Sequence, residues 1–230
     1  MSVSSAAHEE HNPYLSGHFQ TEEQETEACT MGMWLFLVQE VMFFGGMFAA
    51  YGVYRYLYHD AWLEGSRSLN WVLGGFNTVF LLLSSFTAAM AVYHAQTGNN
   101  RKVGWFMVYT LILGAIFLFI KWTFEWPPKF EFGVVPGTLW GPDAHHYPGL
   151  AAFHNQGALQ IFFFLYFVMT GMHALHMLIG FGVIIWLIWL AWGKEHFDSR
   201  RYLKVEFFGL YWHFVDIVWV FLFPMFYLVT

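Results

Sequence analysis

The sequence has almost no cysteine and little charge. Cys29 is the single cysteine among 230 residues, which excludes an internal disulfide and a CxxC site for a metal or a haem. Charged residues make up 11% of the chain and hydrophobic residues 57%, and the sequence contains no basic patch. Nucleic acid is therefore a poor candidate partner, and the composition is that of a polytopic membrane protein rather than a soluble domain.

The first 29 residues contain no Lys or Arg and no long apolar run. Six glutamates among the first 27 residues account for much of the net charge of -6. Because no charged segment is followed by an apolar run here, we predict no cleaved signal peptide. We expect residues 1–29 to be a solvated polar tail and residues 30–230 to be a membrane domain.

Long apolar stretches follow the tail, and each provides the ~20 mostly apolar residues that a helix needs to cross a bilayer. The pattern predicts an all-α membrane protein with five transmembrane helices in one bundle. Pro127 and Pro128 lack a backbone N–H and therefore predict the end of the third helix. Residues 129–156, rich in Pro, Gly and His, form the one long predicted loop. The predicted helices cover residues 30–54, 70–94, 103–126, 157–192 and 205–229.

Lys and Arg residues are shared unequally between the predicted loops. Cytoplasmic loops of membrane proteins carry an excess of these residues. With a cytoplasmic N-terminus, six of them lie in cytoplasmic loops and three lie outside. We therefore predict a cytoplasmic N-terminus and a C-terminus outside. The six are Arg101, Lys102, Lys194, Arg200, Arg201 and Lys204, and the three are Arg55, Arg67 and Lys129.

Several ionisable side chains lie inside the predicted helices, where they normally face protein or water rather than lipid. Glu40 lies about ten residues into the first helix, roughly 15 Å deep. His173 and His176 lie three residues apart in the fourth helix, and His213 and Asp216 in the fifth, so each pair shares a helix face. Two interpretations stay open for these residues: a proton relay, or polar contacts that hold the helices together.

Glu40 has no basic partner within a turn of its own helix, and such a buried carboxyl tends to stay protonated. His173-x-x-His176 with Glu40 resembles a non-haem iron ligand set, but no Glu-x-x-His repeat accompanies it, and we predict no metal site. Lys121 and Glu125 are four residues apart near the outer edge of the third helix. We expect an outer ion pair between them, with Lys121 extending toward the aqueous side.

Motifs in three of the helices resemble the third subunit of haem-copper terminal oxidases, the cytochrome c oxidase subunit III family. Residues 32–51 (GMWLFLVQEVMFFGGMFAAY) resemble its carboxylate-bearing helix. Residues 170–180 (TGMHALHMLIG) resemble its glycine–histidine motif, and residues 211–221 (YWHFVDIVWVF) resemble its most specific signature. The resemblance covers residues 30–230, with the motifs in the family's order.

The resemblance implies a non-catalytic membrane subunit of an oxidoreductase, without a catalytic residue, haem, copper or other metal in this chain. Haems and copper are expected in partner subunits, above all in the catalytic subunit I. Such a subunit belongs to aerobic electron transport in the bacterial cytoplasmic membrane. It binds phospholipid and supports proton uptake. Its expected partners are the other oxidase subunits and the members of a larger respiratory supercomplex. Glu40 matches the buried glutamate of the family, and His173, His176, His213 and Asp216 match its motif positions.

The chain departs from longer family members, which have seven helices and a lipid-filled cleft between the first two and the last five. Quinol-oxidase and nitric-oxide-reductase-associated relatives share the five-helix form, so the electron donor stays open between cytochrome c and quinol. Two hypotheses of other classes also remain. One is a stand-alone proton-conducting membrane protein, although no inverted repeat is visible. The other is a scaffold for assembly and lipid organisation in which Glu40 is merely satisfied.

Overall fold

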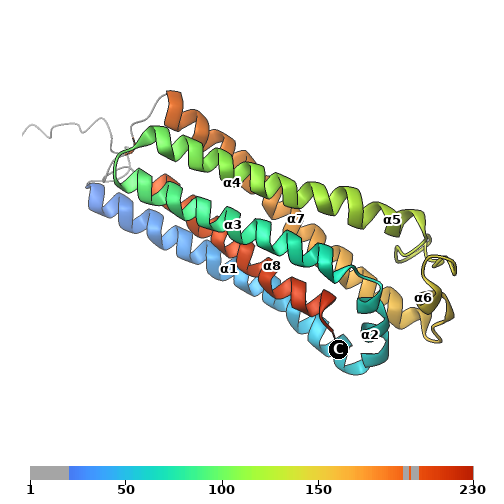
Figure 1. Cartoon of the computed structure of the whole chain (residues 1–230). Helices are drawn as coiled ribbons and strands as arrows, with labels where there is room; N and C mark the ends of the chain where they lie inside the picture. Colours follow the sequence, from blue (N-terminus) through green and yellow to red (C-terminus); the bar gives the residue numbers. More distant parts are fainter. Residues whose placement is uncertain (1–20, 194–196, 198–201, 230) are drawn as a thin grey trace, which may run out of the picture. The chain divides into compact units, whose positions relative to one another are not determined.

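The computed structural model describes residues 21–193, 197 and 202–229 (Figure 1). The chain divides into two compact units, Met1–Gln39 and Glu40–Thr230. Within the described residues, long helices are joined by short helices and loops, and one isolated β-bridge links Val134 to Trp140. The chain is therefore all-α, as the sequence predicts.

The described part of the first unit is the N-terminal portion of helix α1 (Glu22–Leu57). The sequence predicts a helix from Thr30, whereas α1 begins at Glu22. Thr21 acts as an N-cap, because its hydroxyl accepts a hydrogen bond from the Gln24 N–H at 3.2 Å. Glutamates in the first turns of a helix are also stabilised by the helix dipole.

The second unit contains a bundle of four long helices (Figure 1). Helix α3 packs against α4 and α8, and α7 also packs against α4 and α8. The large aromatic side chains of Phe117, Trp212 and Trp219 fill the shared core and are at most 1% exposed. The four helices are α3 (Trp71–Gln96), α4 (Asn100–Ile120), α7 (Gln156–Gly193) and α8 (Leu203–Tyr227).

Helices α7 and α8 approach closely at Gly180. A Cβ atom added there would lie 2.6 Å from the ring of Trp212, so a larger residue would displace this core side chain. The part of α1 that starts at Glu40 meets α8 through long side chains. The Tyr51 hydroxyl donates a hydrogen bond to the Met225 carbonyl, and the Phe44 ring contacts Phe214. These contacts bring Glu40 into the interior of the second unit.

The third predicted helix does not end at its two prolines. A π-helical segment, η1 (Lys121–Glu125), follows α4, and α5 (Trp126–Glu131) follows η1. Pro127 and Pro128 lie in the first turn of α5, where a missing backbone N–H costs little. The predicted end at Pro127 is therefore wrong, because the helical path restarts across the π-helical turn.

Two further short helices occupy segments that the sequence left as loops. Helix α2 (His59–Arg67) packs against α7 and buries Trp62 completely. Helix α6 (Pro148–Ala152) lies within the predicted loop of residues 129–156. Gly133 adopts a φ of 71°, and its carbonyl accepts a hydrogen bond from the Gly141 N–H at 2.9 Å. The predicted loop of residues 129–156 is therefore a folded segment rather than an open loop.

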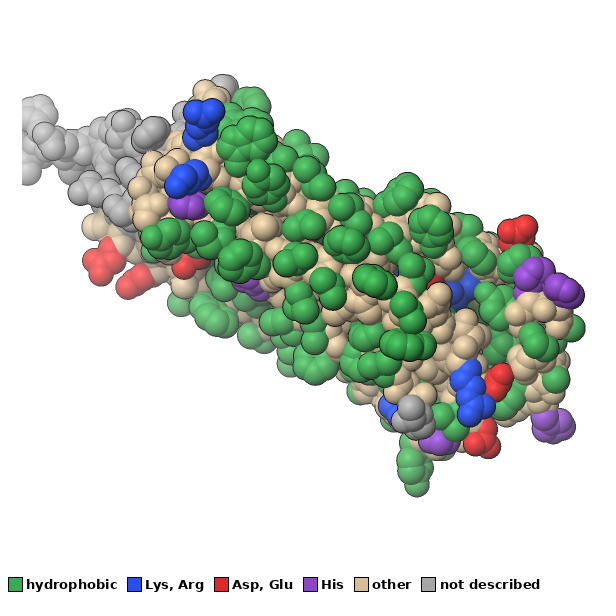
Figure 2. Space-filling view, viewed as in Figure 1, with side chains coloured by type: hydrophobic (Ala, Val, Ile, Leu, Met, Phe, Trp, Pro, Cys, Tyr) green, Lys and Arg blue, Asp and Glu red, His purple; other side chains and the backbone are tan. Residues whose placement is uncertain are grey.

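Five helical segments are long and apolar enough to cross a membrane, which confirms the predicted polytopic class. Figure 2 shows hydrophobic side chains spread along the visible face, with few charged side chains between them. Such a surface is suited to lipid or to other membrane subunits rather than to water. The segments are Glu23–Leu57, Trp71–Gln96, Asn100–Glu131, Gln156–Gly193 and Leu203–Tyr227.

Candidate functional site

Glu40 on α1 and His176 on α7 form a buried polar contact. Glu40 Oε2 lies 3.0 Å from His176 Nε2, and the two side chains are 11% and 10% exposed. His176 Nδ1 lies 2.8 Å from the backbone carbonyl oxygen of Met172, one turn earlier. A carbonyl oxygen can only accept a hydrogen bond, so Nδ1 carries a hydrogen in this arrangement. The contact with Glu40 is therefore made by the other ring nitrogen.

Aromatic rings surround the Glu40–His176 contact. The ring centroids of Phe44 and Phe43 lie 5.2 Å and 6.4 Å from that of His176. Tyr211 on α8 donates its hydroxyl to the His176 backbone carbonyl at 2.8 Å. Rings of this kind lower the local dielectric, which strengthens a satisfied polar contact and makes an uncompensated charge costly.

His173, one turn before His176, lies in a different environment. Its side chain is 1% exposed, and neither ring nitrogen makes a hydrogen bond within the described part of the chain. The ring instead packs against Trp219 and Phe117, with centroids 5.3 Å and 5.7 Å away. The two histidines share a helix, but the hydrogen bond to Glu40 is made by His176.

On α8, His213 and Asp216 also differ from each other in burial and in hydrogen bonding. His213 is half-buried, and its Nδ1 lies 2.6 Å from the Ser85 hydroxyl on α3. Asp216 is 3% exposed, and within the described part of the chain its side-chain oxygens make no hydrogen bond of ordinary geometry, although Ser85 lies close to it. Trp212 and Trp219 add contacts with α3 by donating their indole N–H groups to Ser84 and Thr78. Polar groups on α8 thus hold α3 in place.

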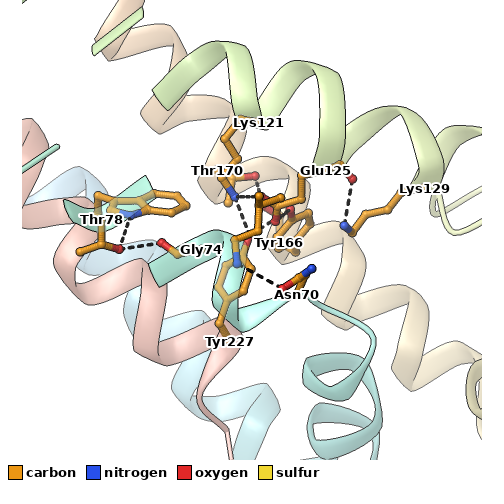
Figure 3. Close-up of polar contacts among 11 residues, drawn as sticks. Asn70, Gly74, Thr78, Lys121, Glu125, Lys129, Tyr166, Thr170 and Tyr227 are labelled. Carbon is orange, nitrogen blue, oxygen red and sulfur yellow. Dashed lines mark hydrogen bonds and ion pairs between the residues drawn. The ribbon is translucent and has the colours of Figure 1, made fainter. Parts of the chain in front are cut away.

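A second polar region surrounds the π-helical turn (Figure 3). Lys121 Nζ lies 2.7 Å from Glu125 Oε2 and donates to the Tyr227 hydroxyl at 2.5 Å. The Tyr166 hydroxyl donates to the other oxygen of Glu125 at 2.6 Å. The Lys121 side chain is 5% exposed, so the expectation that it extends to the aqueous side is wrong. It turns inward because Glu125 and Tyr227 offer it oxygen atoms inside the bundle.

Lys129 joins this region, and the sequence analysis missed it. Its Nζ donates to the Glu125 backbone carbonyl at 3.0 Å and lies 5.3 Å from the centre of the Tyr166 ring. The residue is 4% exposed. The four-residue spacing from Glu125 was an available signal, but the two prolines indicated a loop. Tyr166 and Tyr227 lie on α7 and α8, and no local pattern marks them. We call Lys121, Glu125, Lys129, Tyr166 and Tyr227 the lysine cluster.

These arrangements define what the described residues can do chemically. In residues 21–193, 197 and 202–229, no three His, Cys, Asp or Glu side chains are grouped to hold a metal ion, and Glu40 with His173 and His176 makes no such group. The Glu40–His176 contact can hold a proton between an oxygen and a nitrogen. The lysine cluster places two cations and one carboxylate in the interior, which links η1 and α5 to α7 and α8.

Comparisons with known proteins give consistent matches. A family model described as Cytochrome c oxidase subunit III matches residues 151–230. The Cytochrome c oxidase subunit 3 of a Synechocystis species is 31% identical over 221 residues, which cover 94% of this chain and 82% of that protein. That of Thermostichus vulcanus is 29% identical over 203 residues, with 87% of each chain covered. A Probable quinol oxidase subunit 3 of Staphylococcus epidermidis is 28% identical over 214 residues, covering 89% of this chain and 90% of that protein.

Proposed function

Since this chain belongs to the cytochrome c oxidase subunit III family, we propose that it is a non-catalytic integral membrane subunit of a haem-copper terminal oxidase. The observation that carries the proposal is the 31% identity to the Synechocystis protein over 94% of the chain. In this proposal dioxygen is reduced in the catalytic subunit I, which holds the haems and copper. This chain stabilises that subunit, binds phospholipid and supports proton uptake.

The exposed side chains of the second unit suit this role. Phe76 and Phe86 on α3 are 62% and 63% exposed, and Ile185 on α7 is 57% exposed. Burying such large apolar side chains against lipid tails or another membrane subunit removes them from water. We propose a location in the bacterial cytoplasmic membrane, with the N-terminus cytoplasmic and the C-terminus outside. This orientation places the larger share of the loop Lys and Arg residues in the cytoplasm.

The buried polar residues divide between two roles in this proposal. Glu40 and His176 hold a proton inside the bundle, which fits the distance and the geometry of their contact. His213 contributes cohesion between helices through its contact with Ser85. His173 and Asp216 belong to the same interior, and we propose that they fix the packing of α7 and α8 against the core.

The electron donor of the whole complex is either cytochrome c or a quinol. Both kinds of oxidase subunit occur among the relatives, in Synechocystis and in Staphylococcus epidermidis. The donor is a property of other subunits, so the residues of this chain do not select between them. Oxidation of reduced cytochrome c and of a quinol by the same purified complex separates the two cases.

The proposal is tested by purifying the affinity-tagged full chain from its own membranes in a mild detergent. We expect it to co-purify with a larger subunit, and we expect the preparation to show haem absorption in the visible range. Subunit masses then identify the partners. Recovery of the chain without any haem protein would overturn the proposal. Proton flux through liposomes that hold this chain alone would support a stand-alone proton-conducting protein instead.

Glu40→Gln separates a proton role from a purely structural one. The amide keeps the size of the carboxyl and can donate to His176 Nε2, but it cannot release a proton at neutral pH. We expect the variant complex to assemble and to lose activity sooner than the wild type during continuous turnover. Unchanged turnover and an unchanged active lifetime would favour a scaffold in which Glu40 is only a packing residue.

A further inference from the structure

A small, partly open recess lies between η1 and α7, beside the lysine cluster. Phe117, Lys121 and Trp122 line it from one side, and His173 lines it from α7. Its volume is about 10 Å³, space for one group of the size of a methyl group or a water molecule. We propose that the recess takes the acyl chain of an anionic phospholipid, whose headgroup compensates the positive charge of the lysine cluster. This inference rests on the proposed phospholipid binding and gives that binding a site and a lipid class.

The recess is lined by apolar surface only, although polar residues contribute to its wall. Lys121 directs its ammonium group into the lysine cluster, and Thr170 donates its hydroxyl to the Tyr166 carbonyl oxygen at 2.6 Å. Both ring nitrogens of His173 are covered by neighbouring atoms. A water molecule in the recess would therefore have no hydrogen-bond partner there, whereas an apolar group would gain dispersion contacts with the surrounding rings.

A row of aromatic rings leads from the recess toward the end of α5. Trp122 is 65% exposed, and its ring centroid lies 5.7 Å from that of Trp126. Trp126 and Phe130 both contact Phe167 on α7, with centroids 6.1 Å and 5.5 Å away. These rings belong to segments that are long and apolar enough to cross a membrane, where lipid tails surround a protein. An acyl chain that enters the recess can therefore stay in contact with apolar surface along the row.

The distance from the recess to Lys129 suits one acyl chain. Lys129 lies about two helical turns after Lys121, which corresponds to roughly 12 Å along a helix. The hydrocarbon core of a bilayer is ~30 Å thick, so the chains of one leaflet span roughly 15 Å. A phospholipid with the lower part of one chain in the recess would thus place its headgroup near the level of Lys129.

The charge of the lysine cluster determines which headgroup is favoured. The ammonium groups of Lys121 and Lys129 share the single carboxylate of Glu125, which leaves a net positive charge (Figure 3). Within the described part of the chain, Lys129 forms no ion pair with a carboxylate of its own and donates to the Glu125 carbonyl oxygen. Glu131 at the end of α5 is exposed, so water and salt screen its charge. An anionic headgroup beside α5 would therefore lower the energy of the cluster.

This attraction acts without direct contact between the headgroup and the ammonium groups. Lys121 and Lys129 are each 4% exposed, so a phosphate group does not reach either Nζ atom in this arrangement. A charge in a low-dielectric interior acts over a longer range than a charge in water. The recess and the rings therefore hold the chain, and the field of the lysine cluster selects the headgroup.

The test uses the intact purified complex after detergent has removed loosely bound lipid. The probe is a phosphatidylglycerol with a photoactivatable diazirine near the end of one acyl chain, and mass spectrometry identifies the cross-linked peptides. We expect cross-links in residues 117–126 and 167–174. Unlabelled phosphatidylglycerol should compete roughly fivefold better than phosphatidylcholine with the same chains, the preference that one nearby basic charge gives to an anionic lipid.

Two results would overturn the proposal. One is equal competition by phosphatidylglycerol and phosphatidylcholine, which would mean that the lysine cluster does not select the headgroup. The other is an absence of cross-links in these two segments, as expected if a side chain of another subunit fills the recess. Either result can occur in a complex that co-purifies with a haem protein, so a failure here is distinguishable from a failure of the proposed function.

Two variants separate the headgroup from the chain. Lys129→Met removes the net positive charge, so we expect the fivefold preference to disappear while the cross-links persist. Ala174→Phe places a ring at the wall of the recess, so we expect a several-fold loss of cross-links from either lipid. Arg67→Gln is the matched control, because Arg67 lies on α2 at the same end of the second unit but is 72% exposed and paired with Glu64.

The control should keep both the cross-links and the lipid preference. A preference that survives Lys129→Met, or that Arg67→Gln abolishes equally, would contradict the proposed selection by the lysine cluster. If Ala174→Phe does not assemble, the competition between the two lipids in the wild-type complex still decides.

Discussion

The second unit contains two buried polar regions that differ in their balance of acidic and basic groups. The Glu40–His176 pair has one acid and one base, so it can become uncharged by moving a single proton. The lysine cluster has two lysines and one glutamate, so it carries a positive charge for as long as both lysines keep their protons. The first arrangement suits a group that exchanges a proton, and the second suits a fixed structural joint.

The lysine cluster tolerates its charge because many groups share it. Lys121 Nζ lies 4.4 Å from the centre of the Trp219 ring and 4.9 Å from that of Tyr227, distances at which ring faces attract cations. Tyr166 supplies a hydroxyl to Glu125, and the backbone carbonyl of Glu125 receives Lys129. Removing one member of such a cluster should therefore cost more than removing one member of the Glu40–His176 pair.

The largest expected effect is that of Glu125→Ala. The change leaves Lys121 and Lys129 buried without their carboxylate, and breaking a buried ion pair from one side costs about 3–5 kcal/mol of the free energy of unfolding. Denaturant titration of the purified chain in mixed micelles measures the loss. Glu131→Ala is the matched control, since this exposed glutamate lies at the end of α5, the helix that directly follows Glu125. Equal losses in the two variants would contradict a structural role for the lysine cluster.

Tyr166→Phe should have the next largest effect. The variant keeps the ring beside Lys129 but removes the hydroxyl that donates to Glu125. A hydrogen bond to a charged group contributes about 1.5–3 kcal/mol, so we expect a loss of that order in the same titration. Tyr109→Phe on α4, where the side chain is 48% exposed, is the control and should change the unfolding free energy little. A loss no greater than that of the control would mean that the cluster does not depend on Tyr166.

His176→Phe should cost less than Glu125→Ala. Glu40 loses its base but can keep a proton and remain uncharged, so the expected loss in unfolding free energy is about 1–2 kcal/mol, that of one unsatisfied polar group. The same titration measures it. His94→Phe is the control, because His94 stacks on Phe106 with centroids 5.2 Å apart and belongs to another helix. A loss as large as that of Glu125→Ala would show that Glu40 stays ionised, and the comparison between the two regions would then fail.

The sequence predicted the positions of the helices better than the contacts between side chains of different helices. Apolar length alone indicated five spans, and intrahelical spacing indicated that Lys121 and Glu125 could meet. Spacing within one helix could not indicate that Tyr166 and Tyr227 complete the contact, because these residues lie on other helices. The end of the third helix was mispredicted for a related reason. Pro127 stops an α-helical ladder, but a π-helical turn changes the hydrogen-bond pattern just before it.

The Glu40–His176 contact shows the same limit. Glu40 has no basic neighbour on its own helix, and the spacing of His173 and His176 gives no reason to choose between them. The choice depends on which face of α7 meets α1, and this is a property of packing rather than of either helix. In the structure His173 faces the rings of Phe117 and Trp219, so His176 is the histidine left to meet the carboxyl group.

Asp143 and His146 repeat the carboxylate–imidazole contact outside the membrane-spanning segments, where the smallest effect is expected. Asp143 Oδ2 lies 2.5 Å from His146 Nδ1, with side chains 43% and 46% exposed. Hydrogen bonds from the His146 ring and the His145 backbone hold the pKa of Asp143 below its ordinary range. A lowered pKa in the folded loop stabilises it above the ordinary Asp value, and the contribution is lost as the pH falls through the lowered value.

Amide hydrogen exchange of residues 132–147 in the wild type and in Asp143→Asn measures this contribution. At neutral pH we expect slightly slower exchange in the wild type, and we expect the difference to vanish in acid, once Asp143 is protonated. Identical exchange at every pH would mean that the contact does not order the loop.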